Sequence, residues 1–279
     1  MSYIKKRLGL FKDPSFNFLS IETLLGALSV GITYVALSWH ILSIENSINS
    51  IVILMATWWL PGPLLGPIGG YLADRFSKKK ILLVSQIINI VILIFFLAIP
   101  GAMYSLIPIF TYTLFRGITY GVSFPANIVL TREIINDDSK LLFANSTINA
   151  IFELGMILGM SFGGLAISFL DIHILFIVVL ALNILACIAN YLIRTKKHPI
   201  KSPKSFIKSW IGVYNYLKVK KFLWCYFIAQ VLLTAIFMTA PTFIAPYTKN
   251  ILNGSSFDFG IIETGLSAGF IIGNLTLSA

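Results

Sequence analysis

Long apolar stretches separated by short polar segments run the whole length of the chain. Each stretch is about 20 residues or longer, enough for a helix rising ~1.5 Å per residue to cross a hydrocarbon core of about 30 Å. None of them alternates apolar and polar residues over about ten positions, as a transmembrane β-strand does. The pattern predicts an all-α polytopic membrane protein with spans near residues 16–41, 50–73, 81–99, 105–130, 141–170, 172–193, 222–247 and 257–279.

The polar segments alternate between strongly basic and nearly neutral. Clusters of Lys and Arg occupy the N-terminal segment, the connection at residues 74–80 and the connection at 194–220. Because Lys and Arg collect in cytoplasmic loops, these segments, and with them the N-terminus, are predicted to be cytoplasmic. The same bias explains the net charge of +10. We therefore expect the lipid bilayer as a partner and no nucleic acid.

Composition narrows the function classes further. The 279 residues are 57% hydrophobic and only 11% charged, whereas soluble domains carry about 25% charged residues. The three histidines are far apart, no phosphate-binding loop is present, and Cys187 and Cys225 fall in different spans. We expect no enzyme activity, no cofactor and no metal site, so that any transport runs on an ion gradient.

The order of stretches suggests two unequal parts. We expect an N-terminal six-helix bundle at residues 1–193, a basic cytoplasmic connector at 194–220, and the first two helices of a second, incomplete bundle at 221–279. In the connector, Ser202 and Pro203 suit the start of a helix. The apolar residues that follow recur at helical spacing between lysines, which is typical of a helix lying on the inner membrane surface. A solvated linker is the alternative.

A short internal sequence similarity supports a repeated architecture. Residues 65–73 of the second stretch and 158–166 of the fifth both read Leu-Gly, a gap, Gly-Gly, and then Leu-Ala nearby. The second and fifth helices correspond when three helices are repeated as three plus three. The gap differs by one residue, so chance similarity is the alternative.

The connection after the second stretch carries the most specific motif, Gly70-Tyr71-Leu72-Ala73-Asp74-Arg75-Phe76-Ser77-Lys78-Lys79-Lys80. It resembles the signature loop of the major facilitator superfamily, Gly-x-Leu-x-Asp-Arg-x-Gly-Arg-Arg, with Lys at the usual Arg positions. Asp74 lies beside a cluster of cations, where it can accept charge-assisted hydrogen bonds or face a helix N-terminus. The resemblance implies a cytoplasmic gate that holds the outward-facing state, formed by Gly70, Asp74, Arg75, Lys78 and Lys79. The alternative is that the lysines only set the topology.

Two further segments resemble motifs of drug exporters in this superfamily. Arg116 in the fourth stretch matches their intramembrane Arg. The fifth stretch looks like their antiporter motif, Gly-x-x-x-Gly-Pro-x-x-Gly-Gly, except that Met160 replaces the Pro; this leaves close helix packing intact but removes the expected kink. Ordinary packing of small residues is the alternative. The matching residues are Gly155, Gly159, Gly163 and Gly164.

The overall layout is similar to the macrolide-efflux and transmembrane secretion effector branch. The resemblance implies a major facilitator fold with about eight of twelve helices present, in the cytoplasmic membrane of a bacterium. It also implies proton-coupled efflux of a small amphipathic, macrolide-like compound by alternating access, and multidrug resistance. The alternatives are export of a siderophore, lysolipid or peptide, and a truncated membrane protein or half-transporter scaffold that does not transport.

Charged residues inside the spans are the candidates for proton coupling or substrate binding, because each costs several kcal/mol in hydrocarbon unless it is paired or hydrated. We predict Glu22, Arg116 and Glu153 as proton-coupling or substrate residues. Arg116 and Glu153 are expected to face each other near mid-membrane, either as a static ion pair or as a switch released by protonation. Glu22 either reaches water near the cytoplasmic end or binds a proton or cation. Glu263 also lies inside a span.

Aromatic residues of several spans are candidates for the walls of a substrate pocket. Packing or anchoring at the membrane interface is the alternative for each of them. The candidates are Tyr34, Trp58, Trp59 and Tyr120.

Overall fold

The computed structural model describes residues 3–135, 137–195 and 221–276, and these are helical with short connections. No strand occurs among them. The predicted amphipathic helix of the connector lies outside the described residues. The elements are α1 (Tyr3–Leu10), α2 (Pro14–Ile44), α3 (Ile48–Trp59), α4 (Pro61–Arg75), α5 (Lys78–Ala98), the 3-10 helix η1 (Ala102–Tyr104), α6 (Leu106–Ile134), α7 (Asp138–Ala166), α8 (Ile172–Leu192), α10 (Lys221–Asn250) and α11 (Ser256–Thr276).

A helix accounts for each of the eight predicted spans, so the all-α fold class is confirmed. Among the described residues, five segments combine the length and hydropathy needed to cross a membrane: Pro14–Ile44, Ile48–Arg75, Lys78–Ala98, Ser139–Ala166 and Ile172–Leu192. The second span is divided into α3 and α4 at Leu60. Pro61 follows at once, and a proline inside a helix removes a backbone hydrogen bond and clashes with the preceding turn. The short helix α1 before the first span was not predicted.

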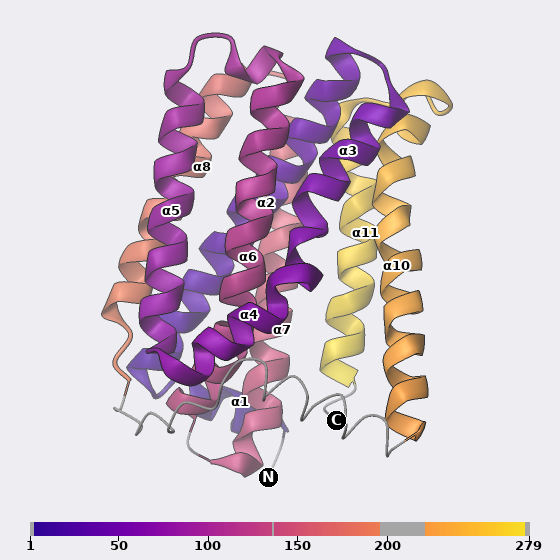
Figure 1. Cartoon of the computed structure of the whole chain (residues 1–279). Coiled ribbons are helices and arrows are strands. Elements are labelled where there is room, and N and C mark those ends of the chain that lie inside the picture. The colour runs from indigo at the N-terminus through magenta and orange to yellow at the C-terminus, as the bar shows by residue number, and fades with distance from the viewer. Residues whose placement is uncertain (1–2, 136, 196–220, 277–279) are drawn as a thin grey trace.

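The two ends of the bundle differ in charge. Figure 1 shows α1 and the connection between α4 and α5 at one end, and the connections after α5 and α10 at the other. We call the first, which carries the lysine clusters, the basic end, and the second the neutral end. The basic end is the one predicted to be cytoplasmic.

Helices α2–α8 form a bundle, and α10 and α11 form a helix pair beside it (Figure 1). Within the bundle, α2 packs mainly on α7 and α8, and α6 packs mainly on α3, α4 and α5. The pair joins the bundle chiefly through α11, which packs along α7 and touches α2, while α10 touches α2 and α3. The main apolar core includes buried residues of α2, α3, α5, α6 and α8.

Glycine spacing explains why α7 approaches two neighbours closely. Gly155 and Gly159 face α2, where added Cβ atoms would lie 2.7 Å from Ala27 Cβ and 2.4 Å from the carbonyl oxygen of Leu28. Gly164 faces α11 instead, and a Cβ there would lie 2.6 Å from the carbonyl oxygen of Ser256. Small residues at such positions let helix backbones come together in a membrane. The glycines of α7 therefore allow two close contacts, one with α2 and one with α11.

Candidate functional site

Two lysines of the signature loop, Lys78 and Lys79, contact other helices of the bundle. Lys78 forms an ion pair with Glu133 at the end of α6, at 2.9 Å. The Lys79 ammonium donates to the carbonyl oxygens of Tyr191 and Ile193, at 2.6 and 2.7 Å. These contacts tie the start of α5 to the ends of α6 and α8. Gate function stays a prediction, because these contacts do not involve α10 or α11.

The other residues of the loop motif have different surroundings. Asp74 is exposed, and a Cβ added to Gly70 would meet nothing within 4 Å. The Arg75 guanidinium lies 4.3 Å from the centre of the Tyr71 ring, a cation–π contact. The exposed Asp74 carboxylate and the open surface at Gly70 therefore lie on the part of α4 left uncovered in this structure.

Arg116 is buried on α6 among aromatic and polar neighbours. It is 8% exposed, its Nη1 donates to the Tyr112 hydroxyl at 3.1 Å, and its guanidinium lies 5.6 Å from the Trp58 ring. The expected ion pair between Arg116 and Glu153 was wrong: no ion pair joins these two described residues. The reason is helix rotation, because α6 turns Arg116 toward α3 while α7 turns Glu153 toward α11.

Three of the four predicted pocket aromatics lie together beside Arg116. The Trp58 and Trp59 rings stack at 6.4 Å, and Trp59 meets Tyr120 edge-on at 6.2 Å. Phe124, which was not predicted, continues the group at 5.3 Å from Tyr120. We call Trp58, Trp59, Tyr120 and Phe124 the aromatic wall. Tyr34 is not part of it.

Glu153 lies between the aromatic wall and the helix pair. Its carboxyl interacts with the Ser267 hydroxyl of α11, and its charge acts on Tyr120 of the wall. It is partly exposed. The aromatic wall thus has Arg116 beside Trp58 and the charge of Glu153 acting on Tyr120.

Glu22 occupies a separate, closed polar network inside the bundle. Its carboxylate accepts from Gln86 Nε2 at 2.7 Å, and Gln86 in turn accepts from Asn190 Nδ2 at 2.9 Å. Thr23 contributes a longer contact at 3.4 Å. The network links α2, α5 and α8, so the sequence prediction found the buried carboxylate but not its partners.

Tyr34 and Glu263 meet across the contact between the bundle and the helix pair. The Tyr34 hydroxyl donates to Glu263 Oε1 at 2.8 Å, and both side chains are buried. Phe259 lies one turn earlier on α11, with its ring 6.0 Å from Tyr34 and 6.3 Å from Trp39. Glu263 was noted in the sequence only as an intramembrane charge, because nothing in the pattern pairs α2 with α11.

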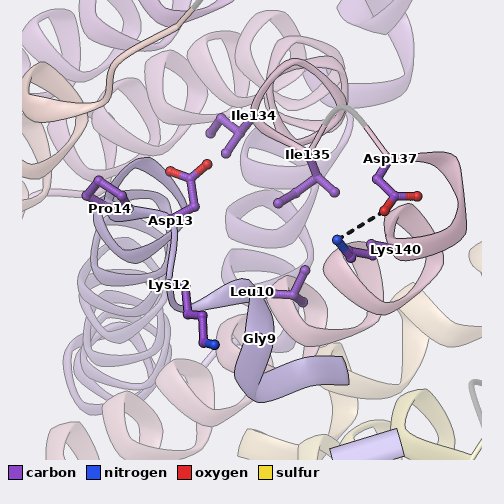
Figure 2. A pocket seen from close by; sticks show the side chains of 9 residues that line it. All are labelled: Gly9, Leu10, Lys12, Asp13, Pro14, Ile134, Ile135, Asp137 and Lys140. Carbon is purple, nitrogen blue, oxygen red and sulfur yellow. Dashed lines mark ion pairs between the residues drawn. The ribbon is translucent and has the colours of Figure 1, made fainter. Parts of the chain in front are cut away.

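A pocket at the basic end contains none of the predicted site residues. It lies between α1 and the connection from α6 to α7, and Figure 2 shows the Lys140–Asp137 ion pair on its rim, at 3.0 Å. Hydrogen bonds from Ser139 and Lys140 hold the pKa of Asp137 below its usual range. The lining residues are Gly9, Leu10, Lys12, Asp13, Pro14, Ile134, Ile135, Asp137 and Lys140.

The sequence matches the Major Facilitator Superfamily over residues 19–279. The chain belongs to this family. Its members are transporters rather than enzymes, and this one is a multi-pass membrane protein. The family match identifies the superfamily and does not identify the macrolide-efflux branch. Comparison with curated proteins gives no match.

Solved structures confirm the fold of this family member. A crystal structure of the nucleoside transporter NupG carrying a D323A mutation aligns with a TM-score of 0.73 at 16% identity, covering 94% of this chain and 66% of that one. A second structure of NupG gives 0.64 at 16% identity, with 94% and 64% covered. The chain thus spans slightly less than two thirds of the length of these relatives. Identities this low show the fold alone.

Proposed function

We propose that the protein takes part in secondary active transport, exporting a small amphipathic compound against proton entry by alternating access. Efflux, proton coupling and residence in a bacterial cytoplasmic membrane belong to this proposal. The family and the fold support transport of a small molecule. The arrangement around Arg116 supports the finer statement.

The observation that carries the proposal is an aromatic wall with a buried guanidinium beside Trp58 and a carboxyl group that acts on Tyr120. Among the described residues, Arg116 has no carboxylate partner, although a buried charge is costly in a membrane. The wall offers apolar rings on which a flat or apolar molecule can stack. Arg116 then suits a polar or anionic group of the cargo, and Glu153 suits the coupled proton.

Reconstitution of the full-length protein in proteoliposomes tests this directly. Fluorescent amphipathic drugs, a macrolide and the nucleoside uridine are offered under an imposed pH gradient, with and without a protonophore. We expect gradient-driven movement of an amphipathic compound that the protonophore abolishes. Glu153→Gln should abolish accumulation of cargo driven by the pH gradient but leave exchange of cargo, because the amide cannot ionise.

Other outcomes decide between the alternatives. Transport of uridine alone replaces drug efflux with nucleoside transport, the activity named for the solved relatives. A siderophore, a lysolipid and a peptide are offered in the same assay, and movement of one of these instead of drugs would assign that cargo class. No transport of any probe by the wild-type protein favours a non-transporting scaffold.

A further inference from the structure

Two carboxyl groups lie at the contact between the bundle and the helix pair, and each meets a hydroxyl of the opposite part. Tyr34 of the bundle donates to Glu263 of α11 at 2.8 Å. Ser267 of α11 interacts with Glu153 of the bundle. The arrangement is reciprocal, since the carboxyl group belongs to the pair in one contact and to the bundle in the other. Ionisation of either carboxyl group therefore affects the same contact between the bundle and the helix pair.

Glu263 is the more enclosed of the two. It is 4% exposed, and the fully buried Phe259 ring lies one turn away on the same helix. Within the part of the chain that the structure describes, no Lys or Arg forms an ion pair with it. One charge-assisted hydrogen bond does not offset the cost of burying an ion.

The neighbouring charged groups are engaged elsewhere. The helices packed on α11 are α7, α10 and α2. Their titratable side chains include Glu153, Lys249 and Tyr34. Lys249 donates to the carbonyl oxygen of Leu42 at 2.7 Å and lies 5.8 Å from the Trp39 ring. On α11 itself, Asp258 accepts from Ser255 at the helix start, at 2.7 Å. His40 of α2 bonds to Met103 at 2.9 Å, inside the bundle.

Hydrogen bonds between α7 and α11 lie on both sides of Glu263 along α11. Ser168 and Ser256 share a hydrogen bond at 2.8 Å, and Ser161 and Thr264 share one at 2.9 Å. Glu263 follows Ser256 by seven residues, about 10 Å along the helix at ~1.5 Å per residue. Because Glu263 is only 4% exposed, separation of α11 from α2 and α7 at this end would bring water to it.

We infer that Glu263 is a proton-binding site whose occupancy controls separation of α11 from α2 and α7 at the neutral end. When the end is sealed, the carboxyl group holds a proton and stays neutral. When the end opens, water hydrates the group, the proton leaves to water and the carboxylate remains. A proton is favoured over a metal ion, because a metal needs several oxygen ligands and Glu263 faces one hydroxyl and aromatic rings. The inference rests on the proposed alternating access.

Distance measurement between spin labels tests the inference without any cargo. Labels at Ile48→Cys on α3 and Leu252→Cys after α10 occupy exposed positions on the two sides of the contact. The full chain, with Cys187 and Cys225 replaced by Ser, is reconstituted in lipid nanodiscs between pH 5 and 8.5. We expect a short distance at low pH, with the ratio of short to long distances changing by up to tenfold per pH unit, as one proton requires.

Matched variants distinguish the role of Glu263 from the roles of its neighbours. Glu263→Gln keeps an acceptor for Tyr34 and cannot ionise, so the short distance should persist at every pH. Tyr34→Phe should shift the population toward the long distance. Glu45→Gln is the control. Glu45 is an exposed carboxyl group at the same end and accepts a hydrogen bond from Ser50, and its replacement should keep the wild-type response.

The inference fails if the wild-type distance does not depend on pH, or if Glu263→Gln responds to pH like the wild type. A response lost in Glu153→Gln but kept in Glu263→Gln would transfer the role to Glu153 and overturn it too. Because no cargo is present, failure of the transport assay leaves these distances interpretable, and the two proposals stand or fall separately.

Discussion

Gly159 lies where the backbones of α7 and α2 come closest. A Cβ atom at this position would stand 2.4 Å from the carbonyl oxygen of Leu28, a backbone atom that cannot rotate away. We expect Gly159→Ala to force the helices apart and to lower the free energy of unfolding by about 1–3 kcal/mol. Thermal unfolding of the detergent-solubilised protein, followed by loss of the monodisperse peak on size exclusion, measures this.

Gly26→Ala is the matched control on α2. A Cβ there meets nothing within 4 Å, and Ala favours a helix over Gly by about 1 kcal/mol. The control should therefore be as stable as the wild type or slightly more so. Equal losses in both variants would contradict a role for close packing at Gly159.

Residue types were easier to predict than residue partners. The spacing of Gly155, Gly159 and Gly163 indicates one packed helix face from sequence alone, and α2 occupies that face. Arg116 and Glu153 were placed at similar depth, yet depth does not give the rotation of a helix about its axis. That rotation, set by packing of whole helices, is why the expected ion pair is absent and why Tyr34 meets Glu263.

At the scale of elements, Lys79 joins the start of α5 to the end of α8. Its ammonium satisfies the carbonyl oxygens of Tyr191 and Ile193, which have no partner within the helix at its last turn. We expect Lys79→Met to lower the free energy of unfolding by about 1–2 kcal/mol, because the carbonyls lose a charged donor. The neighbouring Lys80 is exposed, so Lys80→Met should leave the unfolding temperature unchanged, and a similar loss there would argue against this capping contact.

Asp137 makes the start of α7 sensitive to acid. Its carboxylate accepts from the Ser139 backbone N–H at 3.0 Å and from the Ser139 hydroxyl at 2.6 Å, and the pKa of Asp137 is lowered as a result. A lowered pKa means stability that is present above the unfolded value of about 3.9 and is lost as pH falls through the folded pKa. Asp137→Asn can still cap the helix but does not titrate.

The expected result is a smaller drop in unfolding temperature for Asp137→Asn than for the wild type between pH 5 and pH 3. Other carboxyl groups contribute equally to both proteins, so the difference between the two drops isolates Asp137. Identical drops would show that the charge of Asp137 does not stabilise α7.

Element boundaries followed closely from the hydrophobic pattern because a membrane requires long apolar helices with polar connections. The first span was predicted at residues 16–41 and forms α2 over Pro14–Ile44. The division at Leu60 was missed, although Pro61 and Pro63 stand in the middle of the apolar stretch. Proline is tolerated in membrane helices, so its presence alone does not predict a break.

On the scale of the whole molecule, the alternating access proposed above requires the bundle and the helix pair to separate at the neutral end. Ser168 and Ser256 lie across that contact with their hydroxyl oxygens 2.8 Å apart, which is close enough for a disulfide once both are cysteine. We expect Ser168→Cys with Ser256→Cys, in a background lacking Cys187 and Cys225, to stop transport when oxidised. Dithiothreitol should restore it. Each single cysteine variant serves as the control, and the oxidised double variant should also keep the Ile48–Leu252 distance short at every pH. Full transport with the disulfide closed would mean that this contact does not open during the cycle.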